Sequence, residues 1–294
     1  MIREPYFHQF ALAELLPFFE QFPTQYLSGK RNIKLAYRHL IQPESAVRKL
    51  MILVNGQGYD VLLFDHRGQG YSQRIIPQKG HLDEFRFYVD DMAKIIEKVT
   101  ALFSYSTQHL LAHSMGALIS TYYLANCDHR INKAVLSSPF YGIPLKHPIR
   151  DELIIALMNI LGQGERYVFG KGPYQQAHLA YNELTFCKTR MKWMNRVNRK
   201  NPAINLGGPT FRWVHLCLNA IKRLPKVIPK IEIPILILQA EKEKIVDNKN
   251  LEKLTALFPH AESILVPQAK HEILFEKDNV RKAVLERMNQ FLHS

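Results

Sequence analysis

Two kinds of segment alternate along this chain: short apolar runs rich in β-branched residues, and longer stretches with helical spacing. Most of the apolar runs are continuous, which is typical of strands buried on both faces of a parallel sheet. This alternation predicts an α/β fold, with a mostly parallel central sheet and helices on both faces. We expect strands at Lys30–Leu40, Lys49–Asn55, Tyr59–Asp65, His109–Ser114, Lys133–Pro139, Ile233–Gln239 and Ser263–Pro267. The helical patterns lie at Phe85–Leu102, Met115–Asn126, Asn248–Phe258 and Lys277–Leu292.

The middle of the chain breaks this alternation. Between residues 140 and 229, many Pro, Gly, Asn and basic residues accompany irregular helical stretches. An insertion between two strands of a parallel sheet lies over the edge where those strands end. We therefore expect an α/β core made of residues 1–139 and 230–294, and an inserted basic helical cap, or lid, made of residues 140–229.

The formal net charge of +13 is concentrated in this predicted cap. The segment from Phe186 to Lys230 holds eleven Lys and Arg residues and no Asp or Glu. No nucleic-acid recognition motif accompanies the charge, so we expect no specific nucleic-acid partner. A phosphodiester headgroup or an anionic membrane surface is the partner we expect instead. The cap also has an apolar run that we expect to line an acyl channel, namely Leu153, Ile154, Ile155, Leu157 and Met158.

The cysteines and the apolar runs bear on where the protein works. Cys127, Cys187 and Cys217 are an odd number at wide spacings, which fits neither a disulfide framework nor a structural zinc site. The longest apolar runs are far shorter than the ~20 residues that span a bilayer, and the N-terminus lacks the residue order of a secretory signal. We expect a reducing compartment on the cytoplasmic side, and no sequence motif indicates a cofactor or a metal.

One junction between strands is too short for the predicted sheet. Only Gly56, Gln57 and Gly58 separate two strand-like runs, whereas parallel neighbours need a crossover of about a dozen residues or more. One interpretation is a hairpin whose turn uses the two glycines. The other interpretation, which we favour, is that the chain lacks the residues of a loop and a helix at this point.

Ser114 lies between a continuous apolar strand and a helical pattern, with Ala112 and Gly116 two residues away on either side. This is the nucleophile-elbow pattern, in which a sharp turn leaves room only for small second neighbours and exposes the serine hydroxyl at a helix N-terminus. Alanine stands where glycine is commonest, but it is small enough for the turn. The same geometry directs the backbone N–H of Met115 at a developing oxyanion. Ser114 is therefore the candidate nucleophile.

The candidate base and acid follow the last two predicted strands. His271 comes after the final strand and before the terminal helix, where the base of such a site is expected. The loop after the preceding strand offers two acids, Glu243 and Asp247. Glu243 stands four residues past the strand end, while Asp247 is adequately explained as the N-cap of the helix that begins at Asn248. We prefer Glu243 as the acid and keep Asp247 as the alternative.

Two other turns support the site without naming a substrate. Asn55 and Gly56 end a strand at the place that normally supplies the second oxyanion donor, so Gly56 is a candidate for the oxyanion hole. The turn Asp65–Gly70 has glycines that permit positive φ and an arginine, Arg67, that can pair with nearby acids. We interpret that turn as structural support.

Taken together, these motifs resemble those of the monoglyceride-lipase-like serine hydrolases of the α/β-hydrolase superfamily, and among them a bacterial lysophospholipase subgroup, the L-two type. The resemblance covers nearly the whole chain, cap included. Ala112 and a glutamate acid look like features of that subgroup. The residues that carry the resemblance are Asp65–Gly70, Leu111–Gly116, Gly207–Thr210 with Trp213, Gln239–Glu241 and His271–Glu276.

The resemblance implies an enzyme that cleaves the acyl ester of lysophospholipids, through an acyl-enzyme on Ser114 with His271 as base and Glu243 as its orienting acid. It implies no cofactor. The alternatives within hydrolases are a monoacylglycerol lipase, a general carboxylesterase or an aminopeptidase of related fold. The alternative from a different class is a catalytically inactive lipid-binding protein. The basic cap further suggests peripheral binding to the inner membrane.

Overall fold

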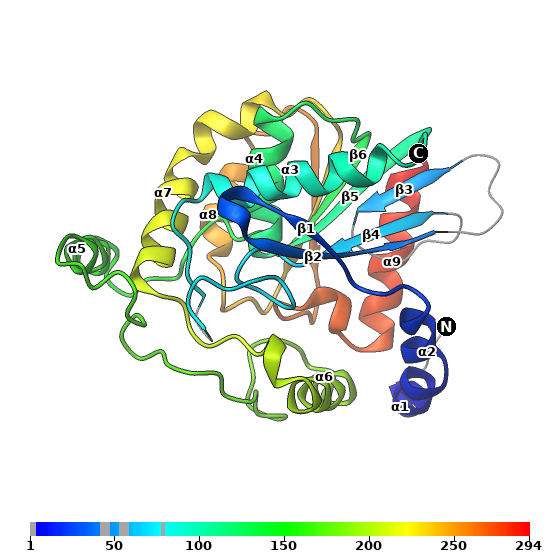
Figure 1. Ribbon diagram of the computed structural model, residues 1–294, viewed down its shortest axis with the longest axis horizontal. Coiled ribbons are helices and arrows are strands. Elements are labelled where there is room, and N and C mark those ends of the chain that lie inside the picture. Colours follow the sequence, from blue (N-terminus) through cyan, green and yellow to red (C-terminus); the bar gives the residue numbers. More distant parts are fainter. Residues whose placement is uncertain (1–3, 42–47, 53–58, 78–79) are drawn as a thin grey trace.

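The computed structural model describes residues 4–41, 48–52, 59–77 and 80–294. Within these residues, eight strands form a single sheet with the order β1-β2-β4-β3-β5-β6-β7-β8 (Figure 1). Gln25–Ser28 (β1) and Lys34–Leu40 (β2) pair antiparallel at one edge, and β2 pairs antiparallel with β4. The remaining neighbours are parallel; these strands are Lys49–Ile52 (β3), Asp60–Phe64 (β4), Thr107–His113 (β5), Lys133–Ser137 (β6), Ile235–Ala240 (β7) and Ala261–Val266 (β8).

Helices cover both faces of this sheet, which confirms the predicted fold class. On one face, α3, α4 and α7 pack with the inner side chains of the strands into the largest hydrophobic cluster. On the other face, α9 closes a second cluster with β7 and β8. The bounds of these helices are Arg86–Thr100 (α3), Met115–Asn126 (α4), Phe211–Val227 (α7), Asn248–Thr255 (α8) and Asp278–His293 (α9).

Three helices lie between β6 and β7, within the predicted cap: Pro148–Ile160 (α5), Lys188–Lys200 (α6) and α7. The inner face of α7 packs into the main core, where Cys217, Ile221 and Leu224 are buried. α5 packs against α7, and α6 lies at the lower edge of the molecule (Figure 1). α7 therefore packs into the core although it lies within the predicted cap. The boundary between cap and core at residue 229 stays a prediction.

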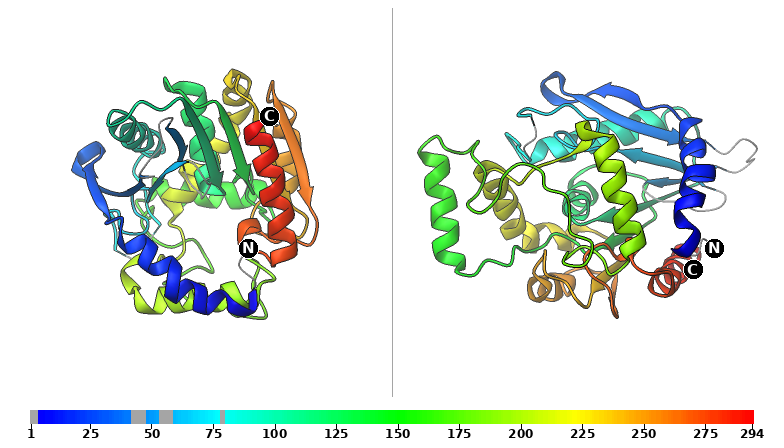
Figure 2. Two further views of the ribbon diagram at one scale, coloured as in Figure 1. Left: turned by 90° about the vertical axis from the view of Figure 1, so that its right-hand side faces the viewer. Right: turned by 90° about the horizontal axis from the view of Figure 1, so that it is seen from below.

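The N-terminal segment is helical, which the sequence patterns did not predict. It consists of α1 (Phe7–Phe10), a π-helical turn at Ala11–Leu15 and α2 (Leu16–Glu20), and it lies beside α6 (Figure 2). The edge strand β1 was also not predicted, because it is short, polar and mostly exposed. Short 3₁₀ turns complete the fold at Glu4–Tyr6, Lys30–Asn32, Pro202–Ile204, Ile228–Lys230 and Ile273–Phe275.

The pairing of β3 with β4 is parallel, with Leu50 opposite Asp60 and Ile52 opposite Leu62. The hairpin interpretation of the Gly56–Gly58 junction is therefore wrong, because a hairpin joins antiparallel strands. The other interpretation concerns residues 53–58, which lie outside the described residues.

Within the part of the chain that the structure describes, no helix has the length and apolar content needed to cross a membrane.

Candidate active site

Ser114 occupies the tight turn between β5 and α4. Its backbone angles, φ 51° and ψ −118°, lie in a region that non-glycine residues rarely adopt. The turn is held from both sides: the N–H of Ser114 donates to the carbonyl of Ser137 at 2.9 Å, and its carbonyl accepts from the N–H of Phe140 at 3.1 Å. Bonds to the end of the neighbouring strand β6 thus fix a strained backbone that presents the serine hydroxyl.

The structure brings Ser114, His271 and Glu243 into one hydrogen-bonded chain. Ser114 Oγ lies 2.9 Å from His271 Nε2, and His271 Nδ1 lies 2.8 Å from Glu243 Oε2. A carboxylate can only accept, so Nδ1 of the neutral imidazole carries the proton and Nε2 is left to accept the serine O–H. The imidazole is 3% exposed and the Glu243 carboxylate is fully buried, so water does not compete for these bonds.

Glu243 is held by the backbone of its own loop. Its Oε1 accepts from the N–H groups of Ile245 at 2.7 Å, Lys244 at 2.9 Å and Val246 at 3.3 Å. Burial alone would raise the pKa of Glu243, but the bond to His271 and the backbone N–H groups together lower it below the usual glutamate value. The side chain is therefore an oriented carboxylate at neutral pH.

Asp247, the alternative acid, has a different place in the structure. Its carboxylate caps α8 and accepts from the N–H groups of Lys249 at 3.0 Å and Asn250 at 3.4 Å. These are the bonds of an N-cap residue. Of the two competing acids, only Glu243 contacts His271.

The loop that carries His271 is held by a serine that the sequence analysis did not single out. Ser138 follows β6, is buried, and has a φ of 43°. Its hydroxyl donates to the carbonyl of His271 at 2.8 Å, and its N–H donates to the carbonyl of Leu238 on β7 at 2.8 Å. Ser138 thus fixes the base relative to the strand ends. The predicted strand Lys133–Pro139 included Ser138, whereas β6 ends at Ser137, so the sequence pattern gave no sign of this role.

A second histidine–glutamate pair lies directly against the first and was also missed. His113 Nε2 lies 3.4 Å from Glu272 Oε1, without the geometry of a hydrogen bond. The rings of His113 and His271 meet edge to face, with centroids 4.8 Å apart. Each member of this pair is the sequence neighbour of a predicted residue, His113 of Ser114 and Glu272 of His271.

The surroundings of the second pair favour its charged forms. Burial disfavours the charged form of His113, but the carboxylate of Glu272 outweighs burial, with Glu243 adding to it, so the pKa of His113 is raised. Burial would likewise raise the pKa of Glu272, and the nearby His113 lowers it below its usual value. The two groups favour each other's ionised forms.

The predicted oxyanion hole has one donor, Met115, within the described residues. Met115 is the first residue of α4, so its N–H has no acceptor within the helix and lies at the positive end of the helix dipole. That position next to Ser114 suits an oxyanion donor. The other predicted donor position, at Gly56, lies outside the described residues.

The turn Asp65–Gly70 packs against the site. Arg67 is almost fully buried, and its guanidinium makes two hydrogen bonds with the Asp91 carboxylate, at 2.6 and 2.8 Å. Gly70 has a φ of +49°, and a Cβ there would lie 2.3 Å from the carboxylate of Asp65. Burial lowers the pKa of His66 to about 4, so its imidazole is neutral at physiological pH. These contacts are those of a structural support.

Neither metal nor thiol chemistry has an evident place among the described residues. They contain no group of three or more His, Cys, Asp or Glu side chains placed to hold a metal ion. Cys127, Cys187 and Cys217 are free thiols, and burial raises the pKa of each, which disfavours the reactive thiolate.

Comparison with known proteins places this geometry in a family. A family model described as the alpha/beta hydrolase fold matches residues 42–278, and the chain belongs to that family. A probable lysophospholipase L2 of Haemophilus influenzae is 87% identical over 310 aligned positions, which cover all of this chain and 99% of the relative. Lysophospholipase L2 of Escherichia coli is 32% identical over 80% of this chain and 73% of its own length.

Solved structures agree on the fold. A soluble variant of monoglyceride lipase from Saccharomyces cerevisiae, in complex with a substrate analog, superposes with a TM-score of 0.70 at 22% identity, covering 92% of this chain and 96% of that one. The matches together define the chain as a carboxylic ester hydrolase of the serine type within the alpha/beta hydrolase family.

Proposed function

We propose that the protein is a lysophospholipase that cleaves the acyl ester of lysophospholipids, with Ser114 as nucleophile, His271 as general base and Glu243 as the acid that orients the base. The observation that carries this proposal is the unbroken chain of hydrogen bonds from Ser114 Oγ through His271 to Glu243. The names of the relatives from H. influenzae and E. coli support the substrate class.

In the first half of the reaction, Ser114 attacks the ester carbonyl while His271 Nε2 takes the hydroxyl proton. The buried Glu243 carboxylate holds the Nδ1–H and stabilises the imidazolium that forms. The Met115 N–H donates to the developing oxyanion. The imidazolium then gives its proton to the departing glycerol oxygen, leaving the acyl group on Ser114.

In the second half, a water molecule replaces the alcohol. His271 Nε2 takes a proton from that water as it attacks the acyl carbonyl, and returns the proton to Ser114 Oγ when the tetrahedral intermediate collapses. The products are a fatty acid and a glycerophosphodiester. Both halves use the same three side chains and the same oxyanion donor.

An apolar layer above the site suits a single acyl chain. Phe140, whose N–H bonds to Ser114, stacks on Trp213 with ring centroids 5.8 Å apart. Trp213 belongs to a cluster that joins α5 to α7 and includes Ile155 and Met158. Leu153 and Leu157, which we expected to line this channel too, are both more than half exposed on the outer face of α5.

A monoacylglycerol lipase or a general carboxylesterase would use the same triad. Turnover of lysophosphatidylcholine, lysophosphatidylglycerol, 2-monoacylglycerol and a short-chain ester, measured side by side, separates these functions. The proposal predicts the highest kcat/KM for a lysophospholipid. A preference for the monoacylglycerol would replace it with the second function, and failure of Ser114 to react with a fluorophosphonate would favour an inactive lipid-binding protein.

We also propose that the protein works on the cytoplasmic side as a peripheral protein of an anionic membrane, which the cap contacts. The acid-free basic segment supports electrostatic attraction. The outer face of α5 supplies apolar side chains that are more than half exposed, namely Ile149, Leu153, Leu157, Ile160 and Leu161. Vesicle flotation tests this proposal, because binding should require anionic lipid and should weaken as salt rises.

A further inference from the structure

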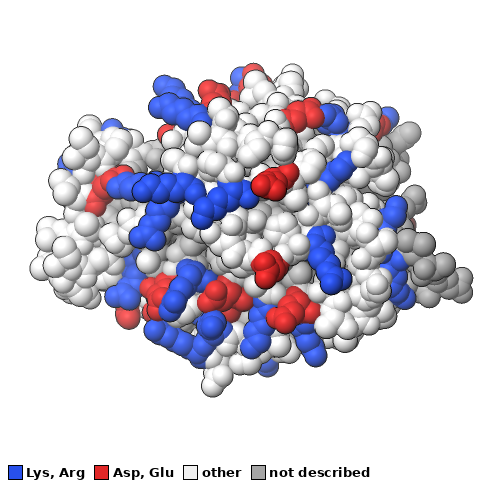
Figure 3. All heavy atoms as spheres, turned by 90° about the horizontal axis from the view of Figure 1, so that it is seen from above, with Lys and Arg blue, Asp and Glu red and all other residues white. Residues whose placement is uncertain are grey.

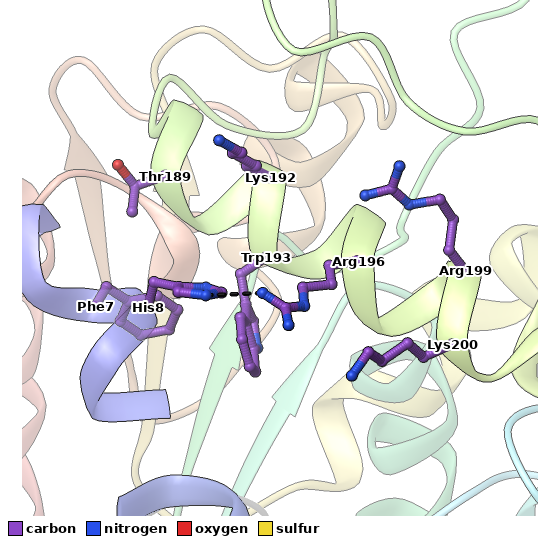
Figure 4. A pocket seen from close by; sticks show the side chains of 8 residues that line it. All are labelled: Phe7, His8, Thr189, Lys192, Trp193, Arg196, Arg199 and Lys200. Carbon is purple, nitrogen blue, oxygen red and sulfur yellow. Dashed lines mark hydrogen bonds between the residues drawn. The ribbon is translucent and has the colours of Figure 1, made fainter. Parts of the chain in front are cut away.

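A hollow of about 620 Å³ lies where α6 meets the N-terminal helix (Figure 4). One face of α6 forms most of the wall of this hollow. The α6 residues that line the hollow recur at spacings of three and four, which places them on the same side of the helix. α1 supplies the opposite wall with Phe7 and His8. The charged and aromatic side chains from α6 are Lys192, Trp193, Arg196, Arg199 and Lys200.

The positive charge of this hollow is not neutralised by the described chain. Among the described residues, none of its four cations forms a salt bridge, whereas Lys222 on α7 pairs with Glu152. Arg196 Nη1 lies 2.7 Å from His8 Nε2 and, because a guanidinium has no acceptor, donates this hydrogen bond. On the face of the molecule seen from above, by contrast, acidic side chains lie among the basic ones (Figure 3). The hollow is therefore suited to an anion.

Aromatic rings line the same hollow beside the cations. Trp193 meets the ring of Phe7 edge to face at 6.2 Å between centroids, and the ring of His8 at 5.5 Å. The helical segment that carries Phe7 also has Tyr6, Leu12 and Leu16 at least 40% exposed. An anionic group with an aliphatic neighbour fits this setting better than duplex nucleic acid, whose bases are stacked inside and whose outer surface is polar. Aromatic residues with one apolar face and one polar edge favour the membrane interface.

The opposite face of α6 is fixed to the loop of the catalytic base. Arg190, which is almost fully buried, donates to the carbonyl of Glu276 at 2.6 Å and pairs with Asp278. The buried Glu276 carboxylate accepts from the N–H of Phe186 at 3.0 Å and from that of Lys270, the residue before His271, also at 3.0 Å. A ligand in the hollow therefore binds to a helix that is joined directly to the active site.

We propose that this hollow binds the phosphodiester headgroup of an anionic membrane phospholipid and so docks α6 on the bilayer surface. The inference rests on the proposed membrane contact and localises it. The cations of the hollow hold the phosphate oxygens, and Trp193 and Phe7 lie against the glycerol and the upper acyl chain. The docked phospholipid is distinct from the substrate, whose ester must reach Ser114.

The test compares two triple variants that remove the same charge. One replaces the hollow's cations, Lys192→Gln, Arg196→Gln and Arg199→Gln. The matched control replaces three exposed cations of α7 in the same basic segment, Lys222→Gln, Arg223→Gln and Lys226→Gln. Both variants also carry Ser114→Ala, so that no lipid is consumed. Thermal unfolding, monitored by circular dichroism, verifies that each variant is folded.

Binding is measured by flotation with vesicles of phosphatidylcholine containing phosphatidylglycerol. We expect the hollow variant to bind about a hundredfold more weakly than the parent, since each basic residue near the surface accounts for about a fivefold change. The control variant should lose less than about tenfold. Equal losses in the two variants would overturn the inference and leave diffuse charge as the cause. If the parent does not bind at all, the membrane proposal itself fails.

A second measurement distinguishes the bilayer from other anions. Trp213→Phe leaves Trp193 as the only tryptophan, and its emission should shift to the blue when phosphatidylglycerol vesicles are added. Inorganic phosphate at millimolar concentration should neither produce this shift nor displace the vesicles. If phosphate alone does so, or if duplex DNA binds more tightly than the vesicles and loses affinity with the hollow variant, the lipid assignment is wrong.

Discussion

Two histidine–glutamate pairs lie side by side in this protein, and they differ in what their imidazoles can reach. In the first pair, His271 forms a 2.8 Å hydrogen bond to Glu243 and a 2.9 Å bond to Ser114. In the second, His113 lies 3.4 Å from Glu272 without hydrogen-bond geometry, and its other nitrogen is 3.4 Å from the hydroxyl of Ser137. The same residue types thus form a continuous chain of hydrogen bonds in one place and a looser electrostatic contact in the other.

The loops explain the difference. Glu243 is held by three backbone N–H groups that direct its free oxygen at His271, whereas the N–H of Glu272 is tied to the carbonyl of Leu184 in the cap segment. We therefore propose that the precise placement of Glu243, and not the mere presence of a carboxylate beside an imidazole, makes His271 the base. The imidazole of His113 packs against that of His271. We therefore interpret the second pair as a support for the position of His271.

The largest contrast between the two pairs is expected when one imidazole or the other is removed. His271→Ala should lower kcat for lysophospholipid hydrolysis by about 10⁴-fold or more, because the serine loses its base. His113→Gln should lower kcat by about tenfold or less, since it removes only a support. Steady-state kinetics on both variants check this. Comparable losses from the two changes would show that His113 takes part in the chemistry.

The acids give the next contrast. Glu243→Gln should lower kcat by about 10³-fold, because an amide leaves the imidazole without its orienting charge. Glu272→Gln should cost less than about tenfold. Asp247→Asn serves as the matched control on the same loop and should leave kcat within about twofold of the parent, since its N-cap is preserved. A larger loss in the Asp247 variant than in the Glu243 variant would reverse the assignment of the acid.

The second pair should appear in the pH dependence of stability. The contribution of His113 is fully present below its ordinary pKa of 6.5 and is lost as the pH rises through its raised folded value. The contribution of Glu272 is present above its ordinary pKa of 4.5 and is lost as the pH falls through its lowered folded value.

Urea unfolding of the parent and of His113→Gln from pH 3 to pH 9 measures this difference. The free energy of unfolding should differ most between pH 4.5 and 6.5, by about 1 kcal/mol, because both side chains are about a third exposed. A difference that does not vary with pH would mean that His113 contributes only through packing.

The smallest expected effect comes from removing the N-cap of α8, which is Asp247, the alternative acid. Asp247→Ala removes the side-chain acceptor for two N–H groups of α8 and should destabilise the protein by about 1 kcal/mol. Thermal unfolding should report the loss. Labelling of Ser114 by a fluorophosphonate should proceed at the rate of the parent, and a strongly reduced rate would indicate that Asp247 supports catalysis.

The sequence predicted those parts of the site that follow directly from strand ends. Ser114 and Glu243 follow the buried strands β5 and β7, and His271 follows the partly exposed strand β8. Parallel strands bring such positions to one edge, and the catalytic roles of the three residues stay a proposal. Ser138 and the pair of His113 with Glu272 were missed because their roles depend on contacts between loops. No spacing rule in a single sequence reports such contacts.

The fold was predicted where apolar periodicity is strong, and α4 begins and ends at the predicted residues. β1 and the N-terminal helices were missed, because their mostly exposed residues leave little apolar pattern. The predicted cap extends through α7, since that helix is strongly basic outside, and only the packing reveals its inner face as part of the core.

The connection between β3 and β4 remains the least ordinary feature of the chain. Seven residues, 53–59, join two strands that pair in parallel, fewer than a usual crossover needs. The alignment with the H. influenzae relative has 310 positions, so at least 16 of them have no residue in this chain of 294. The lack of a loop and a helix at this junction stays a prediction.

The most direct test of the account is lysophospholipid hydrolysis by the parent protein and by Ser114→Ala, with the acyl-enzyme trapped by acid quench and mapped by peptide mass. The account predicts an acyl group on the peptide that contains Ser114 in the parent, and a loss of about 10⁵-fold in kcat with no adduct in the variant. Hydrolysis retained by Ser114→Ala, or an acyl group on another residue, would contradict it.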